Sequence, residues 1–151
     1  MTEVDGCIFC KIAGGNDEKT EILHRDDTLV VFRDIRPATS HHYLVVTTEH
    51  ISDAKQLKFE NLGLVERMVE VGKDVVQKQG GDIIDLRMGF HWPPFHMISH
   101  LHLHVISSTS QMGFIAKGIF MERALWFAKV DWVIDRLKKM KPKDTHSNSG
   151  T

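Results

Sequence analysis

Apolar residues recur along this chain with two different periods, which predict two kinds of element. Runs rich in β-branched and aromatic residues, bounded by polar turns, are typical of strands. They cover residues 21–24, 29–35, 42–46, 83–90 and 101–106. The polar stretch at 25–28 suits a hairpin turn, and Pro93 and Pro94 keep the loop before the last strand irregular. We therefore expect an antiparallel sheet of about five strands.

Between residues 59 and 79 the apolar positions change to a helical period. Side chains that recur three or four residues apart form one apolar face there. They are Leu64, Val65, Met68, Val71, Gly72, Val75 and Val76. Gly80 and Gly81 are expected to end this long amphipathic helix. A second apolar stripe predicts a C-terminal helix over residues 115–140. Strands combined with two such helices predict an α+β fold.

Three histidines, His100, His102 and His104, occupy alternate positions of the last predicted strand. Successive side chains of a strand point to opposite faces, so the imidazoles share one face while Leu101 and Leu103 share the buried one. The outer two histidines would lie roughly 13 Å apart at the backbone, too far for one tetrahedral zinc without strong curvature. An extended anion such as a phosphate ester suits the row better, because one imidazole can attack phosphorus while its neighbours donate to oxygens.

Composition narrows the class of partner. The 151 residues carry a formal net charge of −1, which gives no broad attraction to nucleic acid or to an anionic membrane and favours small anions. No apolar run approaches the ~20 residues that span a bilayer, and the acidic start is unlike a signal peptide. We expect one domain over residues 7–140, with disordered ends at 1–6 and 141–151. A cytoplasmic location, with the nucleus as a second compartment, and reduced cysteines follow from this.

The segment from His100 to Ile106 resembles the His-x-His-x-His-x-x signature of the histidine triad family of nucleotide-binding proteins. The resemblance covers roughly residues 7–110 and has four motifs in the family's order. Besides the signature, these are residues 7–14, 31–37 and 42–51. Residues 87–91, followed by Ser99 before the first triad histidine, resemble the branch that contains aprataxin more than the small dimeric phosphoramidases. The resemblance implies a single histidine-triad-like α+β domain.

The resemblance also implies a role for each matching residue. His102 matches the nucleophile that attacks the α-phosphate and forms a covalent nucleotidyl-histidine, which water then hydrolyses. His104 matches the position that hydrogen-bonds a phosphate oxygen, and His100 the one that orients its neighbours. Asp34 matches the acceptor for the ribose hydroxyls, although an Asp that only caps a turn is the alternative. The implied nucleotide-binding residues are Phe32, Asp34, Ile35, Met97, His102 and His104.

The activity implied by the resemblance is hydrolysis of adenosine 5′-monophosphoramidate, or of acyl- or aminoacyl-adenylates, to AMP. It implies a purine nucleotide ligand, a homodimer, and no cofactor required for catalysis. The small phosphoramidases have a Ser three residues before the first triad histidine, where this chain has Met97, so His96 is the candidate for the missing proton donor. Gly89 stands where those enzymes have an Asn that contacts the nucleotide.

A possible metal site overlaps the first triad histidine. Cys7 and Cys10 alone form a weak zinc signal. Some family members with a similar N-terminus carry a structural zinc on two cysteines and two histidines, and the matching residues here are Cys7, Cys10, His50 and His100. The set has ordinary tetrahedral ligand chemistry. The alternative is two reduced, buried cysteines.

Two other classes of function stay open. The first is a nucleotide- or zinc-binding regulator with little turnover, which the absence of the Ser favours. The second is a DNA-end deadenylase like aprataxin. The chain lacks both the cysteines and histidines of a C-terminal zinc finger and the basic charge that would hold a DNA backbone. This second alternative therefore ranks last.

Overall fold

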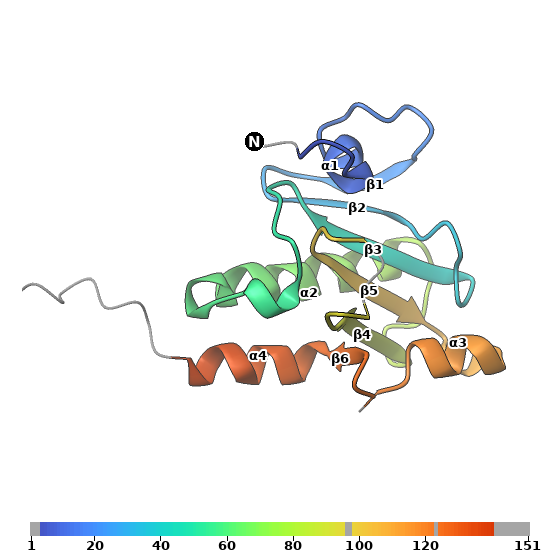
Figure 1. Cartoon of the computed structure of the whole chain (residues 1–151). Coiled ribbons are helices and arrows are strands. Elements are labelled where there is room, and N and C mark those ends of the chain that lie inside the picture. Colours follow the sequence, from blue (N-terminus) through green and yellow to red (C-terminus); the bar gives the residue numbers. More distant parts are fainter. Residues whose placement is uncertain (1–3, 96–97, 123, 141–151) are drawn as a thin grey trace, which may run out of the picture.

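The computed structural model describes residues 4–95, 98–122 and 124–140. Within them, the strands form one six-stranded antiparallel sheet in the order β1-β2-β3-β5-β4-β6 (Figure 1). They are β1 (Ile22–Arg25), β2 (Leu29–Arg33), β3 (His41–Thr47), β4 (Leu86–His91), β5 (His102–Ser107) and β6 (Phe127–Lys129). The five predicted strands are present, and β6 is an additional one.

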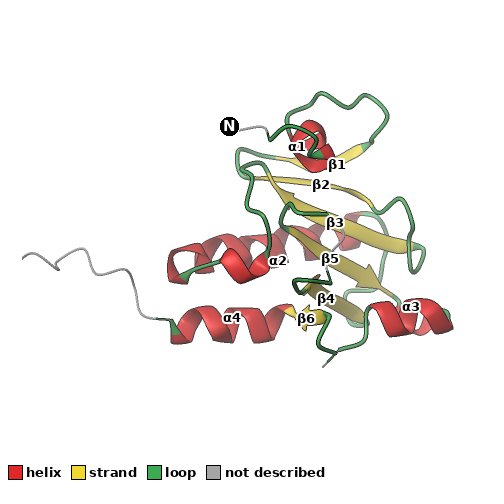
Figure 2. Cartoon of the chain, viewed as in Figure 1, coloured by secondary structure: helices red, strands yellow, loops and turns green. Residues whose placement is uncertain are grey.

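Helices lie on both sides of this sheet (Figure 2). The described residues form α1 (Ile8–Ala13), α2 (Leu62–Lys78), α3 (Phe114–Ile119) and α4 (Val130–Lys139), with short 3-10 helices at Ala54–Gln56, Phe59–Asn61 and Thr109–Gln111. The long helix α2 is the predicted amphipathic helix. It ends one residue before Gln79, and Gly80 follows with φ +84°, the left-handed conformation that glycine supplies at helix ends. The α+β class is confirmed.

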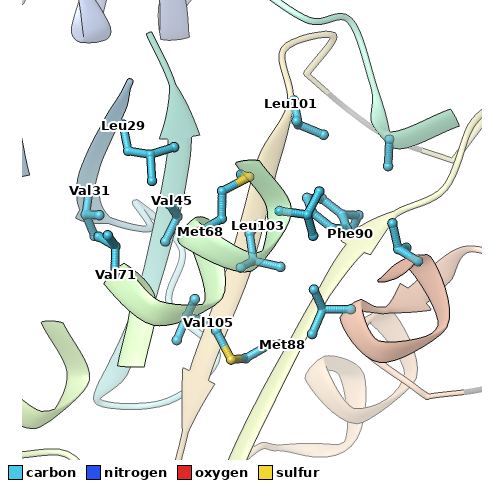
Figure 3. Packing of buried hydrophobic residues seen from close by; sticks show 14 of the residues in the cluster. Leu29, Val31, Val45, Met68, Val71, Met88, Phe90, Leu101, Leu103 and Val105 are labelled. Atoms are coloured by element: carbon cyan, nitrogen blue, oxygen red, sulfur yellow. The ribbon is translucent and has the colours of Figure 1, made fainter. Parts of the chain in front are cut away.

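The main core fills the space between the sheet and the helices α2 and α4. Leu103 and Val105 of β5 lie against Met68 and Val71 of α2, with Phe90 of β4 beside them (Figure 3). All five are at most 3% exposed. Burial of each such side chain contributes about 1.5–3 kcal/mol. The alternation of β5 is therefore confirmed, because its apolar residues face α2 and leave the histidines on the other face.

The opposite face of the sheet carries two smaller apolar clusters, one on each side of the histidines. The first packs α1 against β2 and β3 through Phe9, Ile12, Ala13, Val30, Phe32, Leu44 and Val46. The second lies where the chain leaves α3 and consists of Ile106, Met112, Phe120 and Phe127. The histidine row of β5 therefore lies between α1 and the segment that follows α3.

A glycine lets β6 come close to the histidine face. Gly89 of β4 pairs with His104 of β5 on one side and with Lys129 of β6 on the other. A Cβ atom at this position would lie 2.5 Å from the Phe127 ring and 2.5 Å from the Ala128 carbonyl oxygen. Only glycine fits there without a shift of β6. The close approach positions Phe127 beside the site.

The C-terminal region differs from the expected single helix over residues 115–140. The predicted C-terminal helix is present as α4, but the earlier part of that range contains all of α3 except its first residue, and the strand β6. Gly118 weakens helix formation. The strand β6 forms because it pairs with β4, and the sequence around β6 does not predict this pairing. The short helix α1 was also not expected; the Cys7 Sγ atom caps it by accepting from the Cys10 backbone N–H.

The sequence also predicted that no segment spans a membrane and that both chain ends are disordered. None of the helices in those ranges has the length and apolar character needed to cross a bilayer. The predicted disordered ends fall largely on residues 1–3 and 141–151, which lie outside the described residues. The boundaries 7–140 of the domain therefore stay a prediction.

Candidate functional site

The three triad histidines come from β5 and from the residues just before it. His102 begins the strand and is half-buried, His104 is 5% exposed, and His100 is fully buried. The ring centroids of His102 and His104 lie 5.0 Å apart. The alternation thus brings two imidazoles together on one face, while His100 points its ring into a neighbouring cluster described below.

A main-chain carbonyl fixes the tautomer of His102. The Nδ1 atom lies 2.7 Å from the His100 carbonyl oxygen, and since a carbonyl only accepts, Nδ1 carries the proton. Nε2 therefore holds the lone pair, which is the form a nucleophile needs. Burial lowers the pKa of His102 to about 4, so the ring is neutral at pH 7. Phe9 of α1 stands edge-on to this ring at 5.1 Å and holds its orientation.

A second histidine, His42 of β3, fixes the tautomer of His104. The Ala38 backbone N–H donates to His42 Nδ1 at 2.9 Å, so the proton of the neutral His42 ring is on Nε2. That Nε2 lies 2.9 Å from His104 Nδ1. Because His42 donates, His104 carries its own proton on Nε2. Burial lowers the pKa of His42 to about 4, which keeps this arrangement neutral.

The Nε2–H group of His104 is left without a protein partner. It is buried and makes no hydrogen bond within the described part of the chain. A buried donor without a partner costs about 1–3 kcal/mol. Such a group, next to a nucleophilic imidazole, is placed to donate to an oxygen of a bound anion.

Asp34, predicted to contact ribose, lies beside this pair. One carboxylate oxygen, Oδ1, accepts from the Arg36 backbone N–H at 2.8 Å, which is the turn-capping role of the alternative interpretation. The other, Oδ2, lies 3.3 Å from His42 Nε2 and 3.8 Å from His104 Nδ1. Asp34 therefore both caps its turn and faces the histidines.

The apolar residues predicted to hold the base are separated in the structure. Phe32 is 3% exposed and packs edge-on against Phe9 with ring centroids 5.5 Å apart. Ile35 is 94% exposed. Phe32 is therefore a buried residue that packs beneath the histidine-bearing face of the sheet. Ile35 is the one of the two that is exposed to solvent.

Two residues on the other side of His104 were not predicted from the sequence to belong to the site. His91, at the end of β4, has its ring centroid 4.8 Å from that of His104. Phe120 covers both rings, with centroids 5.0 Å from His104 and 5.2 Å from His91. In the sequence, His91 is part of residues 87–91, which resemble the branch that contains aprataxin, but that resemblance gave it no role. No sequence pattern around Phe120 predicted that it lies at the site.

A small cavity lies at the ends of β4 and β5. His91, Ile98, His100 and His102 are among its lining residues, and its volume is about 10 Å³. This volume holds about one water molecule. Two predicted residues, the proton donor candidate His96 and the nucleotide contact Met97, belong to this stretch of chain but lie outside the described residues.

The predicted zinc ligands do come together. His100 Nδ1 lies 3.3 Å from Cys7 Sγ and 3.4 Å from Cys10 Sγ, and His50 Nδ1 lies 3.2 Å from Cys10 Sγ. All four ligand atoms lie within 4.8 Å of one another. Ligands of a tetrahedral zinc stand about 3.3–3.8 Å apart, so the spacing fits such an ion.

Hydrogen bonding around this cluster also suits a metal. His100 Nε2 donates to the Thr47 carbonyl oxygen at 2.7 Å, which leaves the lone pair on Nδ1, facing the sulfurs. Metal-bound histidines usually make such a bond from the other ring nitrogen. The Cys10 backbone N–H donates to Cys7 Sγ at 3.2 Å and so holds this sulfur beside the other ligand atoms. The donor set therefore fits zinc.

Comparison with known proteins gives three consistent likenesses. A family model described as "Scavenger mRNA decapping enzyme C-term binding" matches residues 6–119. The chain is 48% identical over 133 residues to adenosine 5′-monophosphoramidase HINT3 of Xenopus tropicalis, which covers 87% of each chain. It is 44% identical to the protein of the same name from Mus musculus, over 88% of this chain and 82% of that one.

More distant likenesses reach other members and solved structures. Aprataxin of Gallus gallus is 37% identical over 60% of this chain, which corresponds to 28% of aprataxin. A histidine triad protein from Clostridium difficile has a similar structure, with a TM-score of 0.65, 26% identity, and coverage of 71% of this chain and 94% of that one. The likeness thus extends from the sequence motifs to the fold.

Proposed function

Because this chain belongs to the histidine triad family, we propose that it hydrolyses adenosine 5′-monophosphoramidate and related acyl- or aminoacyl-adenylates to AMP. The proposal rests mainly on the tautomers of His102 and His104, because His102 carries its proton on Nδ1 and His104 carries its proton on Nε2. His102 presents a lone pair on Nε2, and its neighbour His104 presents an unpartnered N–H. Family members of this type bind nucleotides, and the proposed ligand is a purine nucleotide. Catalysis needs no cofactor in this scheme.

The reaction would proceed in two displacements. His102 Nε2 attacks the α-phosphorus, the bond from phosphorus to the amine or carboxylate breaks, and the leaving group takes that electron pair. A carboxylate leaves as it is, whereas an amine needs a proton on its nitrogen, for which His96 is the proposed donor by its sequence position. His104 Nε2–H donates to a non-bridging oxygen and stabilises the charge that grows there in the transition state. Water then attacks the nucleotidyl-His102, and AMP is released. Two moderate barriers replace a single high barrier.

The ribose and the base would extend from the histidines toward β2. Asp34 Oδ2 is the proposed acceptor for the ribose hydroxyls, since Oδ1 is already used by the turn. Ile35 is exposed and is the proposed apolar contact for the base, with Phe32 packed behind it. Met97 completes the proposed nucleotide contacts by its sequence position.

Intact-mass spectrometry after mixing with an acyl-adenylate tests this proposal. We expect the wild type to gain the mass of one adenylyl group for a short time and to release AMP. His102→Ala should form no adduct and should lose essentially all turnover. His24→Ala, a histidine of β1 bonded to Asp26, is the matched control and should retain activity. An active His102→Ala variant would refute the assignment.

The same measurement decides between the proposal and its alternatives. A regulator with little turnover would bind AMP but would accumulate no product. DNA-end deadenylation is the third candidate, and the likeness to aprataxin supports it. An adenylated DNA end in the substrate panel tests it directly, and release of AMP from that substrate alone would place it first.

We also propose that Cys7, Cys10, His50 and His100 hold a structural zinc. The fit of their spacing and the Thr47 bond to His100 support it. When bound, the ion would supply a coordinate link between α1 and His100, which lies two residues before β5 begins. His100 would then brace the start of the strand that carries the nucleophile.

We also propose an assembly state and a location for this protein. A homodimer is proposed because other members of the family resemble this chain, and light scattering of the purified protein tests it. The cytoplasm, with the nucleus as second compartment, is the proposed location, and imaging of the tagged full chain tests that.

A further inference from the structure

We propose that His91 is the general base that takes a proton from water when the nucleotidyl-His102 intermediate is hydrolysed. This inference rests on the proposed function, because it concerns the second step of the same reaction. It assigns a catalytic role to a residue outside the histidine triad.

His91 lies on the same face of the sheet as the catalytic pair. Its ring stands edge-on to the His104 ring, with centroids 4.8 Å apart. His91 and His102 both line the cavity of about 10 Å³ at the ends of β4 and β5. Since that volume corresponds to a single water molecule, the two histidines share a place for the water that the second step needs.

Hydrogen bonding leaves one nitrogen of His91 basic. Nε2 lies 3.1 Å from the Ile119 carbonyl oxygen and therefore carries the proton. Nδ1 then holds the lone pair and makes no bond with the residues that the structure describes. Burial lowers the pKa of His91, and Asp34, His42, His102 and His104 are the charged or titratable groups near it. The ring is consequently neutral at pH 7, which is the form a base needs.

The other histidines of this face cannot take that proton without losing their own role. His102 is covalently blocked in the intermediate. His104 Nδ1 accepts from His42, and its Nε2–H is directed to the phosphate. His42 Nδ1 accepts from the Ala38 backbone N–H. Of the four imidazoles, only that of His91 keeps a lone pair for water.

The step balances without any further reactant. The oxygen of water forms a bond to phosphorus while the bond from phosphorus to His102 Nε2 breaks, and that electron pair returns to Nε2. The proton of the water moves to His91 Nδ1. AMP leaves, and the His91 imidazolium releases its proton to solvent. Both histidines are then restored for the next turnover.

His91→Gln tests this assignment, because a Gln amide can still donate to the Ile119 carbonyl but has no basic nitrogen. We expect the intermediate to form at nearly the wild-type rate and then to accumulate, because its hydrolysis falls roughly 100-fold or more. Rapid quench followed by intact-mass measurement gives the two rates separately. The His24→Gln variant, which replaces a histidine on β1, is the matched control and should leave both rates unchanged.

Fluoride provides a readout that a merely structural role would not change. It is an anionic nucleophile with no proton to remove, so it should accelerate breakdown of the intermediate in His91→Gln and yield adenosine 5′-fluorophosphate. The wild type supplies an independent measurement. Hydrolysis of its intermediate should be slower in D2O, because the transition state of this step includes transfer of a proton from water to His91.

Several outcomes would overturn the inference. Equal losses in both steps, no effect of fluoride, or a wild-type rate that is the same in D2O would each show that His91 does not act as the base. If His91→Gln does not fold, His91→Asn and the D2O measurement decide. A wild type that forms no adduct at all would instead overturn the proposed function, so the two failures are distinguishable.

Discussion

Main-chain groups, rather than charged side chains, determine the chemistry of the histidines at this site. The His100 carbonyl makes His102 a nucleophile through Nε2, and the Ala38 amide, through His42, makes His104 a donor through its own Nε2. A backbone group cannot change its donor or acceptor type, so these assignments survive side-chain motion. The two rings are therefore prepared for opposite tasks before any ligand arrives.

His42 is expected to act as a positioning residue. In His42→Leu, His104 loses the donor that fixes its tautomer, and we expect kcat to fall about 10- to 100-fold while the protein stays folded. His42→Gln, whose amide can still donate, should recover part of that loss. Nitrogen chemical shifts of His104 check the mechanism, because they report which nitrogen carries the proton. Unchanged shifts in His42→Leu would contradict it.

Sequence reasoning reached the triad but not its partners, and the reason is physical. Alternation along a single strand places His102 and His104 on one face whatever the rest of the fold does. His42 and His91 approach them only through the register of β3 and β4 against β5. Register is a tertiary property, and no spacing along the chain encodes it. The same limit hid β6, whose pairing with β4 broke the expected C-terminal helix.

Among the elements, β6 depends most strongly on one residue. In Gly89→Ala, the new Cβ would collide with the Phe127 ring and the Ala128 carbonyl. We expect the free energy of unfolding to fall by about 1–3 kcal/mol. Activity should fall as well, because Phe127 lies beside His91 and His104.

Gly63→Ala is the matched control for this change. Gly63 lies in α2, and nothing stands within 4 Å of a Cβ atom placed there. Alanine should therefore stabilise the helix by about 0.5–1 kcal/mol and leave activity unchanged. Denaturant unfolding of the two variants measures both effects. Equal stability of Gly89→Ala and the wild type would contradict the packing argument.

At the scale of the whole molecule, buried neutral histidines make stability depend on pH. The pKa of His42 is about 4 in the folded protein and near 6.5 in the unfolded chain, so the unfolded state binds more protons between these values. His91 and His104 shift in the same direction. Stability should be complete above pH 6.5 and should fall as the pH drops toward 4.

Thermal unfolding between pH 7 and pH 5 measures this effect. We expect Tm to decrease by several degrees over that interval, since each kilocalorie per mole corresponds to about 2–4 °C in a protein of this size. His42→Leu should show a shallower decrease than the wild type. A Tm that rises on acidification would contradict the sign of the shift.

Zinc is the second property of the whole molecule that can be measured. If zinc saturates Cys7, Cys10, His50 and His100, removal with a chelator should lower Tm by about 5–10 °C, and added zinc should restore it. Native mass spectrometry should show one zinc per chain in the wild type and none in Cys10→Ser. A wild-type mass without zinc after purification in its presence would rule the site out.

The pairing of β6 with β4 affects how readily the sheet adds strands from other protein molecules. Both edges of β4 are hydrogen-bonded within the molecule, and the outermost strands, β1 and β6, are only four and three residues long in the described part. Each ends in an exposed cation, Arg25 and Lys129. Short, charged borders are poor templates for strand addition, so the sheet resists fibrillar aggregation.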